Sequence, residues 1–324
     1  MSSILQVKEE SKMPIIKKEF FAPSSDGIHT LSGAVYLPEG EKKGLFHVVH
    51  GMTEHIERYD RFMIDMAENG YVCFGYDHLG HGKTVKSDDE LGFIASKDGW
   101  QLLAKDVGVF SDAVKREFDA ENKLPYILMG HSMGSFVVRL ASEGYAKPDK
   151  LIIMGTGGAN PAAGMGLKLI SLIKAAKGER HVSRLVYKIA FGSYNKRFGG
   201  GSKEDPSPWL SRDVEVRKKY YADKYCTFKF TVSAMGDLIT LIKLTNDRKW
   251  YDSVPKIPML LVSGEEDPVG NYGKGVKEVY GKLKERGVPV SVKLYSGARH
   301  EILNDETYEQ TKSDITEFVE NDII

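Results

Sequence analysis

The chain has 324 residues, of which 41% are hydrophobic, and it carries 45 basic and 45 acidic side chains. A formal net charge of zero gives no electrostatic basis for binding nucleic acid or a strongly anionic membrane. The two cysteines, Cys73 and Cys226, lie far apart and provide neither a disulfide framework nor a zinc-binding pattern.

The N-terminal stretch, residues 1–20, is charged and lacks a continuous apolar run, so we predict no signal peptide. No run of about 18 apolar residues occurs anywhere, and this length is what a membrane-spanning helix needs. We therefore expect a cytoplasmic protein.

Apolar runs predict strands, and amphipathic spacing predicts helices, in near-regular alternation. In chain order, strands are expected at 15–23, 31–38, 44–51, 71–78, 124–130, 150–158, 257–264 and 288–297. Helices are expected at 56–70, 99–118, 134–145, 272–287 and 307–322. This alternation favours an α/β protein whose mostly parallel sheet carries helices on both faces. Ligands of such sheets bind beyond the carboxyl ends of the strands.

Residues 159–237 interrupt the alternation with two amphipathic, helix-like stretches at 164–178 and 181–194. We interpret this segment as a helical cap over the strand ends, inserted between core regions 1–158 and 238–324. The alternative is a pair of ordinary core helices. The apolar side of the first stretch is expected to pack onto the core. The alternatives are that it faces a substrate tunnel or touches a membrane transiently.

The segment "LPYILMGHSMGSF", residues 124–136, places Ser132 in a G-x-S-x-G pattern between a predicted strand and a predicted helix. This is the context of a nucleophile elbow, in which Gly130 and Gly134 let the strand and helix approach closely. A serine hydroxyl becomes a good nucleophile only when a base removes its proton. Ser132 is therefore the predicted nucleophile, provided that a base follows.

In elbow enzymes the partners follow in the order serine, acid, histidine. Only His181 and His300 come after Ser132, and His300 directly follows the last predicted strand, so we expect it to be the general base. The sequence "SGEEDPV" offers three acids after the preceding strand. We favour Asp267, the deepest in the loop, as the residue that orients His300.

Acyl transfer also needs amide donors for the developing oxyanion. The amide of Met133, the residue after the nucleophile, is one expected donor, and the amide of Met52 in "HVVHGMTEH" is the other. His50 is interpreted as a structural histidine. His78 and His81 lie among glycines with no cysteine nearby, so we predict no metal site. No dinucleotide fingerprint follows the first strands, and no cofactor is expected.

Five motifs, "HGMTEHIERY", "YDHLGHGKT", "GHSMG", "SGEEDPV" and "GARHEI", resemble those of the monoacylglycerol lipase and lysophospholipase group of α/β-hydrolases, in the same order and spacing. The resemblance extends over roughly residues 15–322. It implies an α/β-hydrolase fold with a helical cap, and a triad of Ser132, Asp267 and His300. The family often has arginine and serine in the second motif at the positions of Leu79 and Thr84. This departure affects the expected packing of a structural loop and leaves the expected triad unchanged.

The predicted function is hydrolysis of lipid-type carboxylic esters, with the acyl chain in an apolar tunnel under the cap. A short-chain carboxylesterase, a thioesterase, an acyltransferase or a peptidase would use the same triad, and a non-catalytic binding protein is the alternative of another class. Glu54 and Arg58 are candidate contacts for a polar head group. The alternative, which we favour, is a salt bridge that holds their loop.

Overall fold

The computed structural model describes residues 15–321. Residues 1–14, part of the stretch for which no signal peptide is predicted, and residues 322–324 lie outside the described part. Between residues 15 and 321, no helix is both long and apolar enough to cross a membrane.

The strands are β1 (Ile16–Pro23), β2 (Thr30–Leu37), β3 (Gly44–Val49), β4 (Tyr71–Tyr76), β5 (Tyr126–His131), β6 (Lys150–Met154), β7 (Met259–Gly264) and β8 (Val290–Tyr295). They form one sheet in the order β1-β2-β4-β3-β5-β6-β7-β8. Strand β2 pairs antiparallel with both β1 and β4, and every later pairing is parallel. All eight coincide with the predicted strands to within a few residues.

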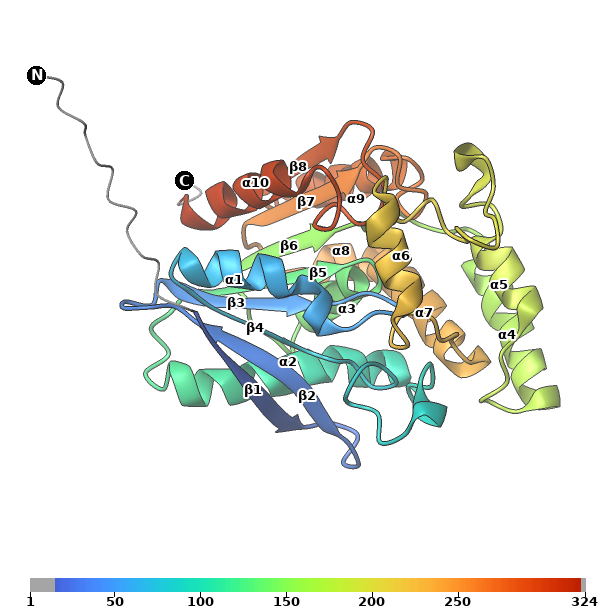
Figure 1. The fold of residues 1–324 in the computed structure, drawn as a ribbon, viewed down its shortest axis with the longest axis horizontal. Helices are drawn as coiled ribbons and strands as arrows, with labels where there is room; N and C mark the ends of the chain where they lie inside the picture. Colours follow the sequence, from blue (N-terminus) through green and yellow to red (C-terminus); the bar gives the residue numbers. More distant parts are fainter. Residues whose placement is uncertain (1–14, 322–324) are drawn as a thin grey trace, which may run out of the picture.

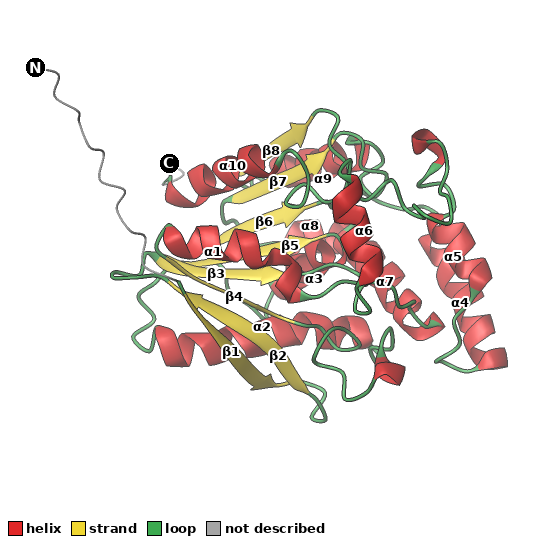
Figure 2. Cartoon of the chain, in the orientation of Figure 1, coloured by secondary structure: helices red, strands yellow, loops and turns green. Residues whose placement is uncertain are grey.

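The helices are α1 (Asp60–Glu68), α2 (Gly99–Phe118), α3 (Met133–Ala141), α4 (Ala163–Lys177), α5 (Arg184–Phe191), α6 (Val214–Ala222), α7 (Val232–Thr245), α8 (Arg248–Ser253), α9 (Lys274–Glu285) and α10 (Tyr308–Glu320). Short 3₁₀ turns occupy Ile56–Tyr59, Asp88–Glu90 and Lys196–Phe198. Figure 2 shows helices on both sides of the sheet.

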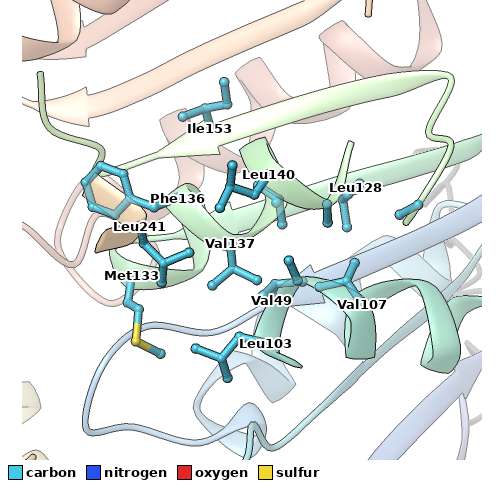
Figure 3. Packing of buried hydrophobic residues seen from close by; sticks show 14 of the residues in the cluster. Val49, Leu103, Val107, Leu128, Met133, Phe136, Val137, Leu140, Ile153 and Leu241 are labelled. Carbon is cyan, nitrogen blue, oxygen red and sulfur yellow. The ribbon is translucent and has the colours of Figure 1, made fainter. Parts of the chain in front are cut away.

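The central strands are buried on both faces, and their side chains alternate between two hydrophobic clusters. Leu45 of β3 and Leu128 of β5 join the cluster that includes α2, α3, α7 and α9. Phe46, which follows Leu45, and Ile127, which precedes Leu128, join the cluster that includes α1 and α10. Figure 3 shows α2 and α3 packing against the sheet in the first cluster. A parallel sheet covered on both faces confirms the predicted α/β-hydrolase fold.

Helices α4, α5 and α6 all fall within residues 159–237, the segment predicted to be the cap. Figure 1 shows α4 and α5 beyond the arrowheads of the central strands, where ligands of parallel sheets bind. Helix α7 begins at Val232, inside the same range, and it packs against α2 and α3 in the core on one side and against α4 on another. The cap segment thus lies over the edge of the sheet at which the predicted site residues converge.

Candidate active site

Ser132 occupies a sharp turn between β5 and α3. Its backbone has φ 54° and ψ −119°, a conformation that residues other than glycine rarely adopt. The turn also requires glycine on both sides. A Cβ at Gly130 would overlap the carbonyl of Gly134, and a Cβ at Gly134 would overlap the carbonyl of Val49. The local sequence therefore holds the serine on a tight, strained bend that presents it to the cavity above the sheet.

Asp267 and His300 form a buried hydrogen-bonded pair. Nδ1 of His300 lies 2.9 Å from Oδ2 of Asp267. Nε2, the other ring nitrogen, is not engaged by this carboxylate. The second carboxylate oxygen of Asp267 accepts from the Val269 amide at 2.8 Å. The two other acids of this loop, Glu265 and Glu266, are exposed. Of the three acids that the sequence offers, the structure pairs Asp267 with the histidine.

The imidazole of His300 is held between two other rings. The His131 ring lies 4.7 Å away and the Trp209 ring, from the loop before α6, lies 5.1 Å away, measured between ring centroids. His300 and Ser132 line the same cavity, but within residues 15–321 no hydrogen bond joins their side chains. The other candidate histidine, His181, lies between α4 and α5 and does not line this cavity.

The loop after β3 lies directly beside Ser132. A Cβ at Gly51 would lie 2.6 Å from Oε1 of Glu54 and 3.0 Å from the Cβ of Ser132, so glycine suits this close approach. The next residue, Met52, lines the cavity together with Met133. Because Met133 is the first residue of α3, its amide has no partner within the helix. Both predicted amide donors thus flank the Ser132 turn.

Glu54 is a buried carboxylate at the centre of this loop, 3% exposed. Its Oε1 accepts from the Gly51 amide at 2.6 Å and from the Tyr59 hydroxyl at 2.9 Å, and Nδ1 of His131 lies 3.3 Å away. Its Oε2 accepts from Arg58 at 2.7 Å. Burial alone would raise the pKa of Glu54, but the His131 hydrogen bond and the Arg58 charge hold that pKa well below its usual range.

Arg58 extends this network to the histidine loop. Its guanidinium donates to both oxygens of Glu301, at 2.8 and 2.6 Å, and stacks over the ring of Tyr220 in α6. Glu301 directly follows His300, so the chain Glu54, Arg58, Glu301 connects the loop after β3 to the loop after β8. Glu54 lines the cavity, and Arg58 does not. Both side chains are engaged by the protein itself.

His131 occupies the first variable position of the G-x-S-x-G pattern, to which the motif assigns no role. Its Nε2 lies 3.2 Å from the carbonyl oxygen of His300, which can only accept. Its Nδ1 lies 2.8 Å from the Tyr59 hydroxyl, whose proton is directed to Glu54. Both ring nitrogens therefore donate, as in an imidazolium. Burial alone would lower the pKa of His131, but the hydrogen bond and charge of Glu54 raise it above the usual value. The only sequence signal that draws attention to His131 is its place between Gly130 and Ser132 in the G-x-S-x-G pattern.

His50 has the structural role expected from the sequence position. Its Nδ1 donates to the Gly51 carbonyl at 2.8 Å, and its Nε2 accepts from the His78 amide at 3.0 Å. Burial lowers the pKa of His50 and of His78. A neutral His50 thus joins the turn at Gly51 to the loop after β4.

The cavity above Ser132 has a volume of about 390 Å³. Its walls come from the core loops, α3, α7 and the cap segment, and they are mostly apolar and aromatic. The apolar lining includes Met52, Met133, Phe136, Tyr187, Phe191, Tyr194, Trp209, Leu210, Phe228, Leu238, Ile242 and Val269. A site of this size encloses most of a small organic ligand.

Helix α6, in the segment predicted to be the cap, is attached to the loop after β3 at two points. The Tyr220 hydroxyl donates to the Thr53 carbonyl at 2.8 Å and lies 2.8 Å from the Thr53 hydroxyl. Nε2 of His55 lies 2.8 Å from Oδ2 of Asp223, the residue that ends α6. The position of α6 is therefore coupled to the loop that carries Met52.

Comparison with known proteins identifies the family of the chain. The family described as serine aminopeptidase, S33, matches residues 40–307. A monoglyceride lipase homolog of monkeypox virus is 26% identical over 273 residues, which cover 84% of this chain and 86% of the viral one. Human monoglyceride lipase is 26% identical over 285 residues, covering 86% of this chain and 82% of the human one.

Among solved structures, a highly thermostable carboxyl esterase from Bacillus coagulans, in complex with glycerol, has a TM-score of 0.87 and 27% identity. The match covers 95% of this chain and 99% of the esterase. Since the family match spans most of the chain, and the fold is that of its structural relatives, the protein belongs to the serine aminopeptidase (S33) family of α/β-hydrolases.

Proposed function

We propose that the protein is a serine hydrolase of lipid-type carboxylic esters, monoacylglycerols or lysophospholipids, that acts through an acyl-enzyme on Ser132. One observation carries this proposal: the strained Ser132 turn and the buried Asp267–His300 pair open onto one apolar cavity. The family relatives named as monoglyceride lipases support the reaction class.

In the proposed reaction, Nε2 of His300 takes the Ser132 proton while Oγ attacks the ester carbonyl. The carbonyl–alkoxy bond then breaks, and His300 returns the proton to the departing alcohol. Water, deprotonated by His300, then attacks the acyl carbonyl. The bond to Ser132 Oγ breaks, His300 returns the proton to Ser132, and the carboxylic acid is released. Asp267 keeps the imidazole oriented and stabilises its charged form. The Ser132–His300 hydrogen bond forms when substrate is bound, as is common for catalytic pairs that are loosely aligned in free enzymes.

The oxyanion of each tetrahedral intermediate would lie on the amides of Met52 and Met133. Donors of this kind stabilise charge only if they are fixed before the reaction. Glu54 fixes the first through Gly51, and the start of α3 fixes the second. We propose that Glu54 and Arg58 serve this loop and do not read the head group, because both oxygens of Glu54 already accept from protein donors.

The lipid-type substrate is supported by the cavity. Its apolar walls suit an acyl chain, and the cap segment supplies several of them, including Tyr187 and Phe191 of α5. Met165 and Leu172 of α4 and Ile189 of α5 are exposed, and we propose that they supply the surface for transient membrane contact. A short-chain carboxylesterase or a thioesterase would use the same triad in a shallower cavity.

Labelling with a fluorophosphonate probe tests the catalytic class. We expect covalent labelling of the intact protein and its loss in Ser132→Ala. Failure of the intact protein to label supports a non-catalytic binding protein, and labelling that persists in Ser132→Ala overturns the Ser132 assignment.

The substrate class is tested by kcat/KM across p-nitrophenyl esters of rising acyl length, beside monoacylglycerols and lysophospholipids. We expect kcat/KM to rise with acyl length beyond butyrate. A sharp fall beyond acetate or butyrate would identify a small-ester esterase instead.

A further inference from the structure

Three potential metal ligands converge where the cap meets the loop after β3. His55 lies on that loop, Asp223 ends α6, and Cys226 follows three residues later. Their ligand atoms all lie within 4.8 Å of one another. Within residues 15–321, no other trio of histidine, cysteine and acidic side chains brings its ligand atoms this close.

The local backbone presents these groups to one another. Oδ1 of Asp223 accepts from the Tyr225 amide at 2.8 Å, so that Oδ2 remains for His55, 2.8 Å away. The Cys226 amide donates to the Asp223 carbonyl at 3.1 Å, which closes a turn that holds the carboxylate and the thiol together. The His55 ring lies edge-on to Tyr225. Two ligands therefore come from one turn, and the third comes from the facing loop.

The donor set selects the kind of cation. One imidazole nitrogen, one carboxylate oxygen and one sulfur suit Zn²⁺, whereas Ca²⁺ and Mg²⁺ prefer sets of oxygens alone. Tetrahedral Zn²⁺ with bonds of about 2.0–2.3 Å separates its ligand atoms by about 3.3–3.7 Å. The His55–Asp223 distance of 2.8 Å and the limit of 4.8 Å bracket that spacing, so side-chain rotations suffice to close the site.

The surroundings accept a positive ion. Arg58 acts electrostatically on Cys226, but its guanidinium is already paired with Glu54 and Glu301. His131, whose two ring nitrogens both donate, also faces Glu54. Counting Asp223, the positive charges of Arg58 and His131 therefore face three negative ones, those of Glu54, Glu301 and Asp223. Cys226 also lines the main cavity, which gives a cation a path to the thiol and leaves a side for a fourth, non-protein ligand.

We propose that His55, Asp223 and Cys226 form a Zn²⁺ site that fastens the turn after α6 to the loop after β3. On binding, the thiol loses its proton to solvent and a sulfur–zinc bond forms, while zinc replaces the hydrogen bond between His55 and Asp223. The site is not a cofactor site of the ester reaction. It is a clasp between the cap and the loop that carries Met52.

Titration of the chelator-treated full-length protein with zinc chloride by calorimetry tests the site. We expect one zinc per chain, proton release that depends on the ionisation enthalpy of the buffer, and a higher Tm with zinc. Affinity should fall at least tenfold in Cys226→Ser and in His55→Asn, and should be unchanged in Cys73→Ala, the matched cysteine control in β4. Absence of saturable binding, or equal affinity in all variants, overturns the proposal.

A second measurement needs no variant. Cys73 is fully buried, so the thiol that an aromatic disulfide reagent reaches through the cavity should be Cys226. Zinc should slow that reaction at least tenfold, while magnesium should not. An unchanged rate in zinc contradicts the site. Neither measurement uses ester turnover, so failure of the proposed hydrolase function and failure of the zinc site are distinguishable.

Discussion

The carboxylate of Glu54 accepts a hydrogen bond from the amide of Gly51 at 2.6 Å. Gly51 lies against Ser132, and Met52 follows Gly51, so this contact holds the loop beside Ser132. The same carboxylate is paired with Arg58 and lies 3.3 Å from His131. One buried acid therefore connects the loop after β3, the serine turn and, through Arg58 and Glu301, the histidine loop.

Replacing Glu54 by glutamine should lower kcat with little change in KM. The amide removes the charge that faces Arg58 and His131, and the loop with the Met52 amide should lose its fixed position. Loss of one oxyanion donor typically lowers kcat about 10²–10³-fold, so we expect a fall of about tenfold or more. Steady-state kinetics on a monoacylglycerol and on p-nitrophenyl butyrate would measure it.

The two substrates separate the roles considered for Glu54. A residue that positions the loop affects both esters equally, whereas a head-group contact affects the glycerol ester selectively. Glu57→Gln is the matched control, because Glu57 lies on the 3₁₀ turn that directly follows this loop, is exposed and pairs with Lys83. A selective loss on the glycerol ester would favour the head-group reading instead.

The backbone conformation at Ser132 predicts an order of stability among variants of this residue. With φ at 54° and ψ at −119°, glycine should adopt this turn with less strain than alanine. We expect Ser132→Gly to be more stable than Ser132→Ala by about 1 kcal/mol in urea unfolding, since strained backbone conformations cost about 1–3 kcal/mol. Equal stability of the two variants would indicate an unstrained turn. The neighbouring pair Ser135→Gly and Ser135→Ala, within α3, should show the opposite order.

Much of this architecture follows from sequence pattern because each signal is local. Strands such as 126–131 are short apolar runs, and the parallel sheet follows from their alternation with amphipathic helices. The pairing of Asp267 with His300 could be anticipated because both follow strands that end at the same edge of the sheet.

The contacts of Glu54 and His131 could not be anticipated in this way. They join residues 77 positions apart, and Glu301 meets Arg58 across 243 positions. Their charges depend on burial and on partners that only the folded chain brings together. Sequence spacing likewise gives no sign that Cys226 lies beside His55. The two residues are far apart in the chain, and the second cysteine of the sequence, Cys73, is in a different part of the fold.

The attachment of α6 predicts a substrate-dependent defect in Tyr220→Phe. This change removes the hydroxyl that donates to the Thr53 carbonyl and should let the cap move relative to the loop. A net hydrogen bond contributes about 1 kcal/mol, which corresponds to about fivefold in kcat/KM. We expect that loss for long acyl chains, which need the cap wall, and a smaller one for acetate esters. Tyr221→Phe, one residue further along the same wall, is the control, and equal losses in the two variants would contradict a specific attachment.

Asp237 predicts how stability depends on pH. It lies on α7, is 6% exposed and accepts from the Trp100 amide at the start of α2 at 3.0 Å. Burial raises the pKa of this carboxyl from its ordinary 3.8 to about 7. The folded chain therefore binds this proton more tightly than the unfolded chain, so stability falls as pH rises from about 4 to 7 and the loss is complete above 7. The difference corresponds to on the order of 4 kcal/mol.

Asp237→Asn should remove this pH dependence, because its amide oxygen can still accept from Trp100 but cannot ionise. Urea unfolding of both proteins at pH 5 and pH 8.5 isolates the charge, since any pH-independent effect of the amide cancels between the two conditions. We expect the variant to gain about 3 kcal/mol relative to the parent protein between these pH values, as most of the rise in cost falls between pH 5 and 7. Asp112→Asn, on the exposed side of α2, should show no such gain. A gain of the same size in both variants would assign the effect to net charge, and no gain in Asp237→Asn would mean that the carboxylate is ionised in the folded chain without penalty.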